Sequence, residues 1–160
     1  MATQPASANV TASQNLLLWS GWDEGIGAYD SVDFYTRMPQ TLMLAMLTNQ
    51  DGFAEPAASW DLGLLDKNGL ELSGNGYGRT NINFRQGNFV NAGLNTVRNG
   101  VTIQWPGATA AWTAAYSLGI YSHADGRLLQ QTPLVNAPVD VGSGDSVSIP
   151  SGDMTVQVQL

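Results

Sequence analysis

Hydrophobic and polar residues alternate along the second half of the chain, which is the pattern of half-buried β-strands. Sequences rich in Gly, Asn, Asp and Ser separate these segments and favour turns. No helical periodicity lies between them, which favours antiparallel pairing over a βαβ arrangement. We therefore predict a mainly β fold, an antiparallel sandwich of the jelly-roll-like kind. The alternating segments are 81–85, 101–105, 114–121, 147–149 and 154–160.

The dipeptide Asn99-Gly100 is the sharpest local signal in this half. It stands between two alternating runs within 95–105. Asn-Gly readily accepts the positive φ angles of a two-residue turn. We predict a tight β-hairpin at this position.

The first third of the chain has a different pattern. Residues 1–12 are small and polar, a composition that becomes ordered when something holds it, and we predict an extended arm. A Leu-rich segment up to Trp19 predicts one or two helical turns capped by Thr11 or Ser13. A second short helix is predicted over 30–38, where Pro39 ends it. The apolar run 41–48 follows as a buried strand.

The length of 160 residues is that of one domain, and we divide the chain into the arm (1–12) and a single β-sandwich domain (13–160). The chain contains no cysteine, so disulfides and thiolate metal sites are excluded. Only 12% of the residues are charged, about half the usual share. A weakly charged surface favours a protein that assembles with others, as a homo-oligomer, because charges are costly to desolvate at contacts.

The net charge of -7 argues against nucleic-acid partners. Residues 1–66 carry most of the acidic charge, and the basic residues of 67–127 are too few for a binding footprint. No apolar run reaches the length of a membrane span, and the N-terminal residues do not resemble a signal peptide. We expect a protein made in the cytoplasm that binds neither membrane nor nucleic acid directly.

Residue types suited to catalysis are sparse. His123, the single histidine, lies beside a predicted turn and is interpreted as a solvated turn residue. Residues 72–124 contain no carboxylate, which argues against a glycosidase pair on the strand half. We predict no enzyme activity and no cofactor. Four N-terminal carboxylates fit solubilising loop charges or, alternatively, a weak calcium site: Asp23, Glu24, Asp30 and Asp33.

The tryptophans divide into two groups. Trp60, Trp105 and Trp112 fall in or near core-patterned segments and are expected to pack inside. Trp19 and Trp22 flank a glycine in an acidic region, where exposed aromatics anchor partners or, alternatively, cap one end of the sandwich. The candidate partner interface is formed by Trp19, Trp22, Asp23, Glu24, Tyr29 and Arg37.

Several stretches of the chain resemble small structural proteins of tailed-bacteriophage virions, a group that includes capsid decoration and tail-fibre proteins. The resemblance covers about residues 10–160. The stretches that carry it are LSGNGYGRTNINF at 72–84, NGVTIQWP at 99–106, WTAAYSLGIY at 112–121, GRLL at 126–129, and 141–160 with its Gly-Ser-Gly-Asp turn.

The resemblance implies a non-enzymatic building block of a virion. The leading hypothesis is a capsid cement protein on the capsid surface, a trimer that clamps the major capsid protein through the arm and residues 19–37. The alternative is a tail-fibre or baseplate component that binds other virion proteins. A third hypothesis, from another class, is a carbohydrate-binding module that uses exposed Trp and Tyr residues.

Overall fold

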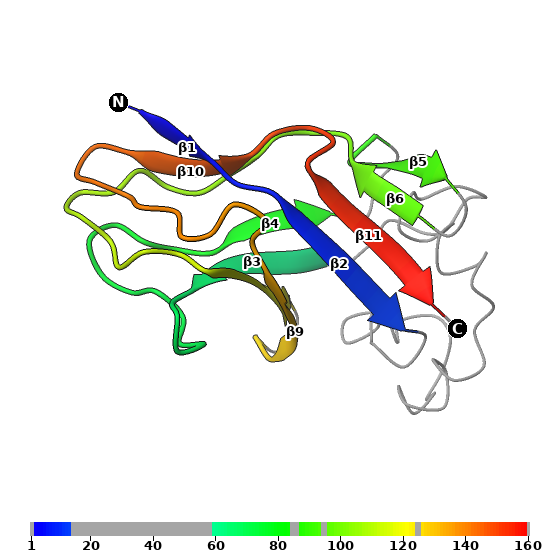
Figure 1. Ribbon diagram of the computed structural model, residues 1–160, viewed down its shortest axis with the longest axis horizontal. Coiled ribbons are helices and arrows are strands. Elements are labelled where there is room, and N and C mark those ends of the chain that lie inside the picture. The colour runs from blue at the N-terminus through cyan, green and yellow to red at the C-terminus, as the bar shows by residue number, and fades with distance from the viewer. Residues whose placement is uncertain (1, 14–58, 84–86, 94–95, 124–125, 160) are drawn as a thin grey trace.

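The computed structural model describes residues 2–13, 59–83, 87–93, 96–123 and 126–159. Within these ranges the chain forms strands arranged in three sheets (Figure 1). The strands are β1 (Thr3–Pro5), β2 (Ala8–Ser13), β3 (Ser59–Leu65), β4 (Thr80–Asn83), β5 (Phe89–Gly93), β6 (Thr96–Asn99), β7 (Ile103–Gln104), β8 (Ser117–Ser122), β9 (Leu128–Pro133), β10 (Ser146–Ile149) and β11 (Met154–Gln159). The sheet orders are β1-β10-β7, β2-β11-β6-β5 and β4-β3-β8-β9.

The prediction of a mainly β fold with mostly antiparallel pairing is confirmed. Two strand pairs are parallel, β1 with β10 and β2 with β11, and the others are antiparallel. The jelly-roll connectivity stays a prediction. The predicted helices up to Trp19 and over 30–38, and the predicted strand 41–48, lie outside the described residues. Thr11 and Ser13, the expected helix caps, belong to β2.

The N-terminal segment is extended, as expected for an arm, but strands of its own chain hold it. β1 pairs with β10, and β2 pairs in register with the whole of β11. Ala6, Ala8 and Val10 are almost completely buried. These residues therefore contribute to the core, and the boundary between arm and domain stays a prediction.

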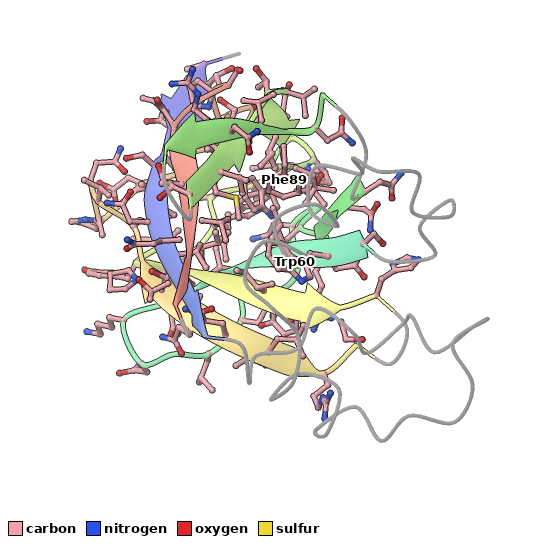
Figure 2. All side chains as sticks on the ribbon, turned by 90° about the vertical axis from the view of Figure 1, so that its right-hand side faces the viewer. Trp60 and Phe89 are labelled. Carbon is pink, nitrogen blue, oxygen red and sulfur yellow. The ribbon has the colours of Figure 1, made fainter. Side chains whose placement is uncertain are left out.

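Large side chains from several strands meet in the core. Trp60 of β3 and Phe89 of β5 make an edge-to-face contact with ring centroids 5.9 Å apart (Figure 2). Trp105 donates a hydrogen bond from Nε1 to the carbonyl oxygen of Leu62 at 3.1 Å. The indole of Trp112 donates to the carbonyl oxygen of Asn75 at 2.9 Å. All three tryptophans are buried, which confirms the prediction that they pack inside.

The predicted hairpin at Asn99-Gly100 is wrong. β6 ends at Asn99, and the next strand, β7, belongs to a different sheet, so the chain crosses between sheets at this point. Gly100 is needed for close approach, because a Cβ atom there would clash with the carbonyl oxygen of Gly87. The dipeptide thus lies where the chain passes from one sheet to another, and the local sequence is the same as that of a hairpin turn.

Among the described residues, no helix is long and apolar enough to span a membrane.

Candidate functional site

A polar surface lies on the outer face of the sheet β4-β3-β8-β9. Side chains alternate along a strand, so the burial of Trp60 and Leu62 places Asp61 and Gly63 on the opposite face. Asp61 stands opposite Asn81 of β4 and Tyr121 of β8. Gly63 stands opposite Gly119. The outer face therefore combines polar side chains with a pair of facing glycines.

The two glycines make room for the ring of Tyr121. A Cβ atom on Gly119 would stand 2.7 Å from Cε2 of this ring, and one on Gly63 would stand 2.8 Å from the same atom. Both distances are shorter than van der Waals contact allows. The ring therefore lies against the bare backbone of β3 and β8, which side chains at these positions would prevent.

Four residues, which we call the Arg79 cluster, build on this ring: Glu71, Tyr77, Arg79 and Tyr121. The guanidinium of Arg79 lies over the Tyr121 ring, 3.5 Å from its centroid, in a cation–π contact. Glu71 accepts two hydrogen bonds from Arg79, from Nε and Nη2, each 2.8 Å long. The Tyr77 hydroxyl donates to Glu71 Oε1 at 3.0 Å and accepts from the backbone N–H of Leu64 at 2.9 Å.

The cluster shifts the pKa values of its members. The hydrogen bond from Arg79 is the main cause that lowers the pKa of Glu71, against the opposing effect of burial. Burial is the main cause that raises the pKa of Tyr77 and of Tyr121, and the negative charge of Glu71 acts in the same direction. At neutral pH the cluster therefore holds one ion pair between two neutral phenols.

Alkaline pH is expected to destabilise the fold through these phenols. Because the folded-state pKa of Tyr77 is raised, its contribution to stability is complete below the ordinary phenol pKa of about 10 and is lost as pH rises through the folded-state value. An absorbance titration of phenolate should show phenols that ionise late in the folded protein, and Tyr77→Phe should remove one of them. The urea-unfolded chain serves as the control, and a Tyr77→Phe titration identical to wild type would contradict the prediction.

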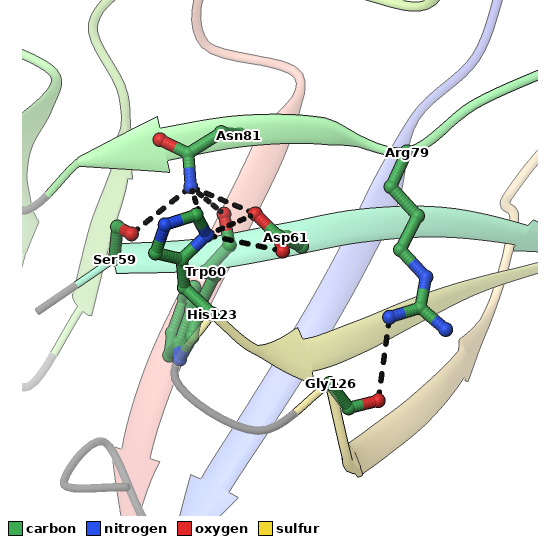
Figure 3. A network of polar contacts seen from close by, with 7 residues as sticks. All are labelled: Ser59, Trp60, Asp61, Arg79, Asn81, His123 and Gly126. Carbon is green, nitrogen blue, oxygen red and sulfur yellow. Dashed lines mark hydrogen bonds and ion pairs between the residues drawn. The ribbon is translucent and has the colours of Figure 1, made fainter. Parts of the chain in front are cut away.

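A second group of polar side chains, the His123 network, lies where the chain enters β3 (Figure 3). It consists of Ser59, Asp61, Asn81 and His123. His123 Nδ1 lies 2.9 Å from Asp61 Oδ1 and 3.1 Å from Oδ2. Asn81 Nδ2 lies within hydrogen-bonding distance of Ser59 Oγ, at 2.9 Å, and of Asp61 Oδ1, at 2.8 Å. The network joins the ends of β3, β4 and β8.

The interpretation of His123 as a solvated turn residue is confirmed for its exposure, since 57% of its side chain is accessible, but it missed the pairing with Asp61. The aspartate orients the imidazole through the contacts at Nδ1. Within the described part of the chain, no group of three or more His, Asp or Glu residues could hold a metal ion. What the network offers chemically is a set of oriented hydrogen-bonding groups at a sheet end.

The predicted interface residues Trp19, Trp22, Asp23, Glu24, Tyr29 and Arg37 lie outside the described residues, as do the candidate calcium ligands Asp30 and Asp33. Sequence reasoning missed the Arg79 cluster. One signal could have indicated it, because Gly63 and Gly119 each interrupt an apolar strand pattern. Glycine inside a strand often marks the close approach of another group.

The chain has sheets built largely from antiparallel strands, and aromatic side chains pack in its core. Polar networks link side chains on its surface. These features define a small structural domain made of strands. No curated protein and no solved structure matches the chain. A family model described as podophage GP4 fiber I protein gp80 matches residues 33–157. The chain belongs to this family and is a fibre-like structural protein of a phage virion.

The family corrects the leading hypothesis from sequence. The resemblance to phage virion proteins is confirmed, but the capsid cement assignment is not supported. The tail-fibre alternative fits the family better. Interaction with other virion proteins follows from this class, whereas capsid binding does not.

Proposed function

We propose that this chain is a subunit of a podophage tail fibre, a non-enzymatic component that binds copies of itself and neighbouring virion proteins. The observation that carries the proposal is the fibre-family match over residues 33–157. The low share of charged residues supports self-association, and a trimer is the assembly we propose. A baseplate position is the nearest variant of the same proposal.

The described chemistry supports a structural role. The ionisable side chains of the Arg79 cluster are engaged with one another, in contacts that stiffen a sheet face. The pairing of His123 with Asp61 likewise ties two strands together. These contacts are those of a scaffold that resists deformation.

The carbohydrate-binding hypothesis depends on exposed aromatic residues. Trp60, Trp105 and Trp112 are buried, so no tryptophan in the described part of the chain can stack on a sugar ring. The structure therefore adds no observation in favour of that hypothesis, which stays a prediction for Trp19 and Trp22.

The location of the protein on the particle tests the proposal. Phage particles labelled with an antibody against the chain should show label on the tail fibres in electron micrographs. Heads purified without tails are the matched control and should carry none. Label on such heads, with bare tails on complete particles, would overturn the fibre assignment in favour of capsid decoration.

A further inference from the structure

The N-terminal segment 2–13 lies in a groove that binds its main chain along both edges. On one edge, four carbonyl groups at every second residue each accept a hydrogen bond from β9 or from the residues that follow it. The pairs are Asn136 Nδ2 to Pro5 O at 2.6 Å, Val135 N to Ser7 O at 2.8 Å, Thr132 Oγ1 to Asn9 O at 2.7 Å, and Gln130 Nε2 to Thr11 O at 2.6 Å.

The other edge of the segment is bound by β10 and β11. Ala6 N donates to the carbonyl oxygen of Ser148 at 2.9 Å, and Ala8 N donates to that of Asp153 at 3.1 Å. β2 then pairs with β11 over six consecutive residues in a parallel register, and Figure 1 shows the two strands side by side and pointing the same way. On the edge that faces β9, three of the four donors are side chains, and they take the place of the N–H groups of a neighbouring strand.

The side chains of the segment contribute small apolar groups at alternate positions. Ala6, Ala8 and Val10 are buried, while Asn9 and Thr11 between and beyond them are exposed. Recognition through main-chain hydrogen bonds, with shallow pockets for every second side chain, is how folded domains bind a separate peptide as an added strand. Residues 2–13 are thus held as a strand ligand would be.

We propose that in the assembled protein this groove receives residues 2–13 of a second copy, so that neighbouring subunits exchange their N-terminal strands. Every contact described above is the same whichever copy supplies the strand. Forty-five residues, 14–58, lie between β2 and β3 in the sequence, and a chain of that length can span at most about 150 Å. Exchange of an identical element is a low-cost route to an oligomer. The inference rests on the proposed fibre role, which places copies next to one another.

Cysteine cross-linking tests this exchange, because the chain has no cysteine of its own. Thr11 and Gln157 stand opposite each other on β2 and β11, both exposed, at a separation that suits a disulfide. Chains carrying only Thr11→Cys and chains carrying only Gln157→Cys are co-expressed, purified and oxidised. We expect a product of twice the 17.0 kDa chain mass, in which peptide mapping finds residue 11 joined to residue 157.

A matched control uses Val90 and Arg98, which pair between β5 and β6. Co-expressed Val90→Cys and Arg98→Cys chains should give no such product, whereas the double variant should form its disulfide within single chains. If Thr11→Cys/Gln157→Cys forms its disulfide only within single chains, and the co-expressed single variants form none between 11 and 157, exchange is overturned. An oligomeric native mass in that case leaves the fibre role standing, so the two failures are distinguishable.

Discussion

Asn99→Ala is expected to lower the free energy of unfolding by roughly 2–6 kcal/mol. The side chain is completely buried at the end of β6 and makes four hydrogen bonds. Nδ2 donates to the carbonyl oxygens of Val101, at 2.8 Å, and Pro150, at 2.9 Å, and Oδ1 accepts from the N–H groups of Gly152, at 3.1 Å, and Met154, at 2.8 Å. Alanine removes the side-chain partner of the Val101 carbonyl oxygen and the Met154 N–H, at roughly 1–3 kcal/mol each. The other two groups keep a backbone partner, because Gly152 N–H also donates to the Asn99 carbonyl oxygen and Pro150 O also accepts from Asp153 N–H.

Urea denaturation followed by circular dichroism measures this effect. Because small domains are stable by only about 5–15 kcal/mol, the variant should unfold at a much lower urea concentration or fail to fold. Asn99→Asp is the matched variant. Its carboxylate can still accept from the N–H groups of Gly152 and Met154, but it has no N–H to donate to the carbonyl oxygens of Val101 and Pro150. Asn68→Ala, in an exposed turn, should change stability by no more than about 0.5 kcal/mol. A comparably small effect at Asn99 would contradict the prediction.

Asn99 also shows what the sequence could and could not predict. The alternation that runs into it is real, because Val97 and Asn99 are both buried on one face of β6. The dipeptide Asn99-Gly100 predicts a local turn, yet three of the four partners of the Asn99 side chain come from residues 150–154. A polar residue that organises distant backbone leaves no periodic signal, so its role appears only once the sheets are assembled.

The strands themselves were predicted more accurately than their partners. Segments 114–121 and 154–160 overlap β8 and β11. In β11 the two-residue period reflects burial of one face, because Met154 and Val156 are buried while Thr155 and Gln157 are not. β8 is buried at every position. The pairing of β2 with β11 brings together the two ends of the chain in parallel, which no local pattern indicates. Composition alone suggested an arm at 1–12 because its buried residues are mostly alanines, which carry little hydrophobic signal.

In the candidate site, too, the sequence indicated local structure but not the contacts between distant residues. Tyr77 and Tyr121 could be expected near a sheet, but their meeting with Glu71 and Arg79 depends on the register of β3 and β8. His123 was assigned correctly to a turn and was still missed as a partner of Asp61, 62 positions away in sequence. Contacts between distant segments are set by strand register, which the sequence pattern leaves open.

Trp105→Ala is expected to lower the free energy of unfolding by about 3–5 kcal/mol, the usual range for truncating a buried tryptophan. Only 1% of the residue is exposed. It follows β7 directly, and its indole reaches Leu62 of β3, so it joins two sheets. Removal leaves a large cavity between them and an unpaired carbonyl group.

Trp105→Phe separates these two contributions. Phenylalanine keeps most of the apolar contact but has no N–H to donate to Leu62 O. This variant should therefore lose clearly less stability than Trp105→Ala. It should still lose more than the roughly 1 kcal/mol of one hydrogen bond, because its ring is smaller than the indole. Urea midpoints and slopes for wild type and both variants measure the difference. Equal losses in the two variants would mean that the hydrogen bond, and not the volume of the ring, holds the sheets together, contrary to the expectation that packing dominates here.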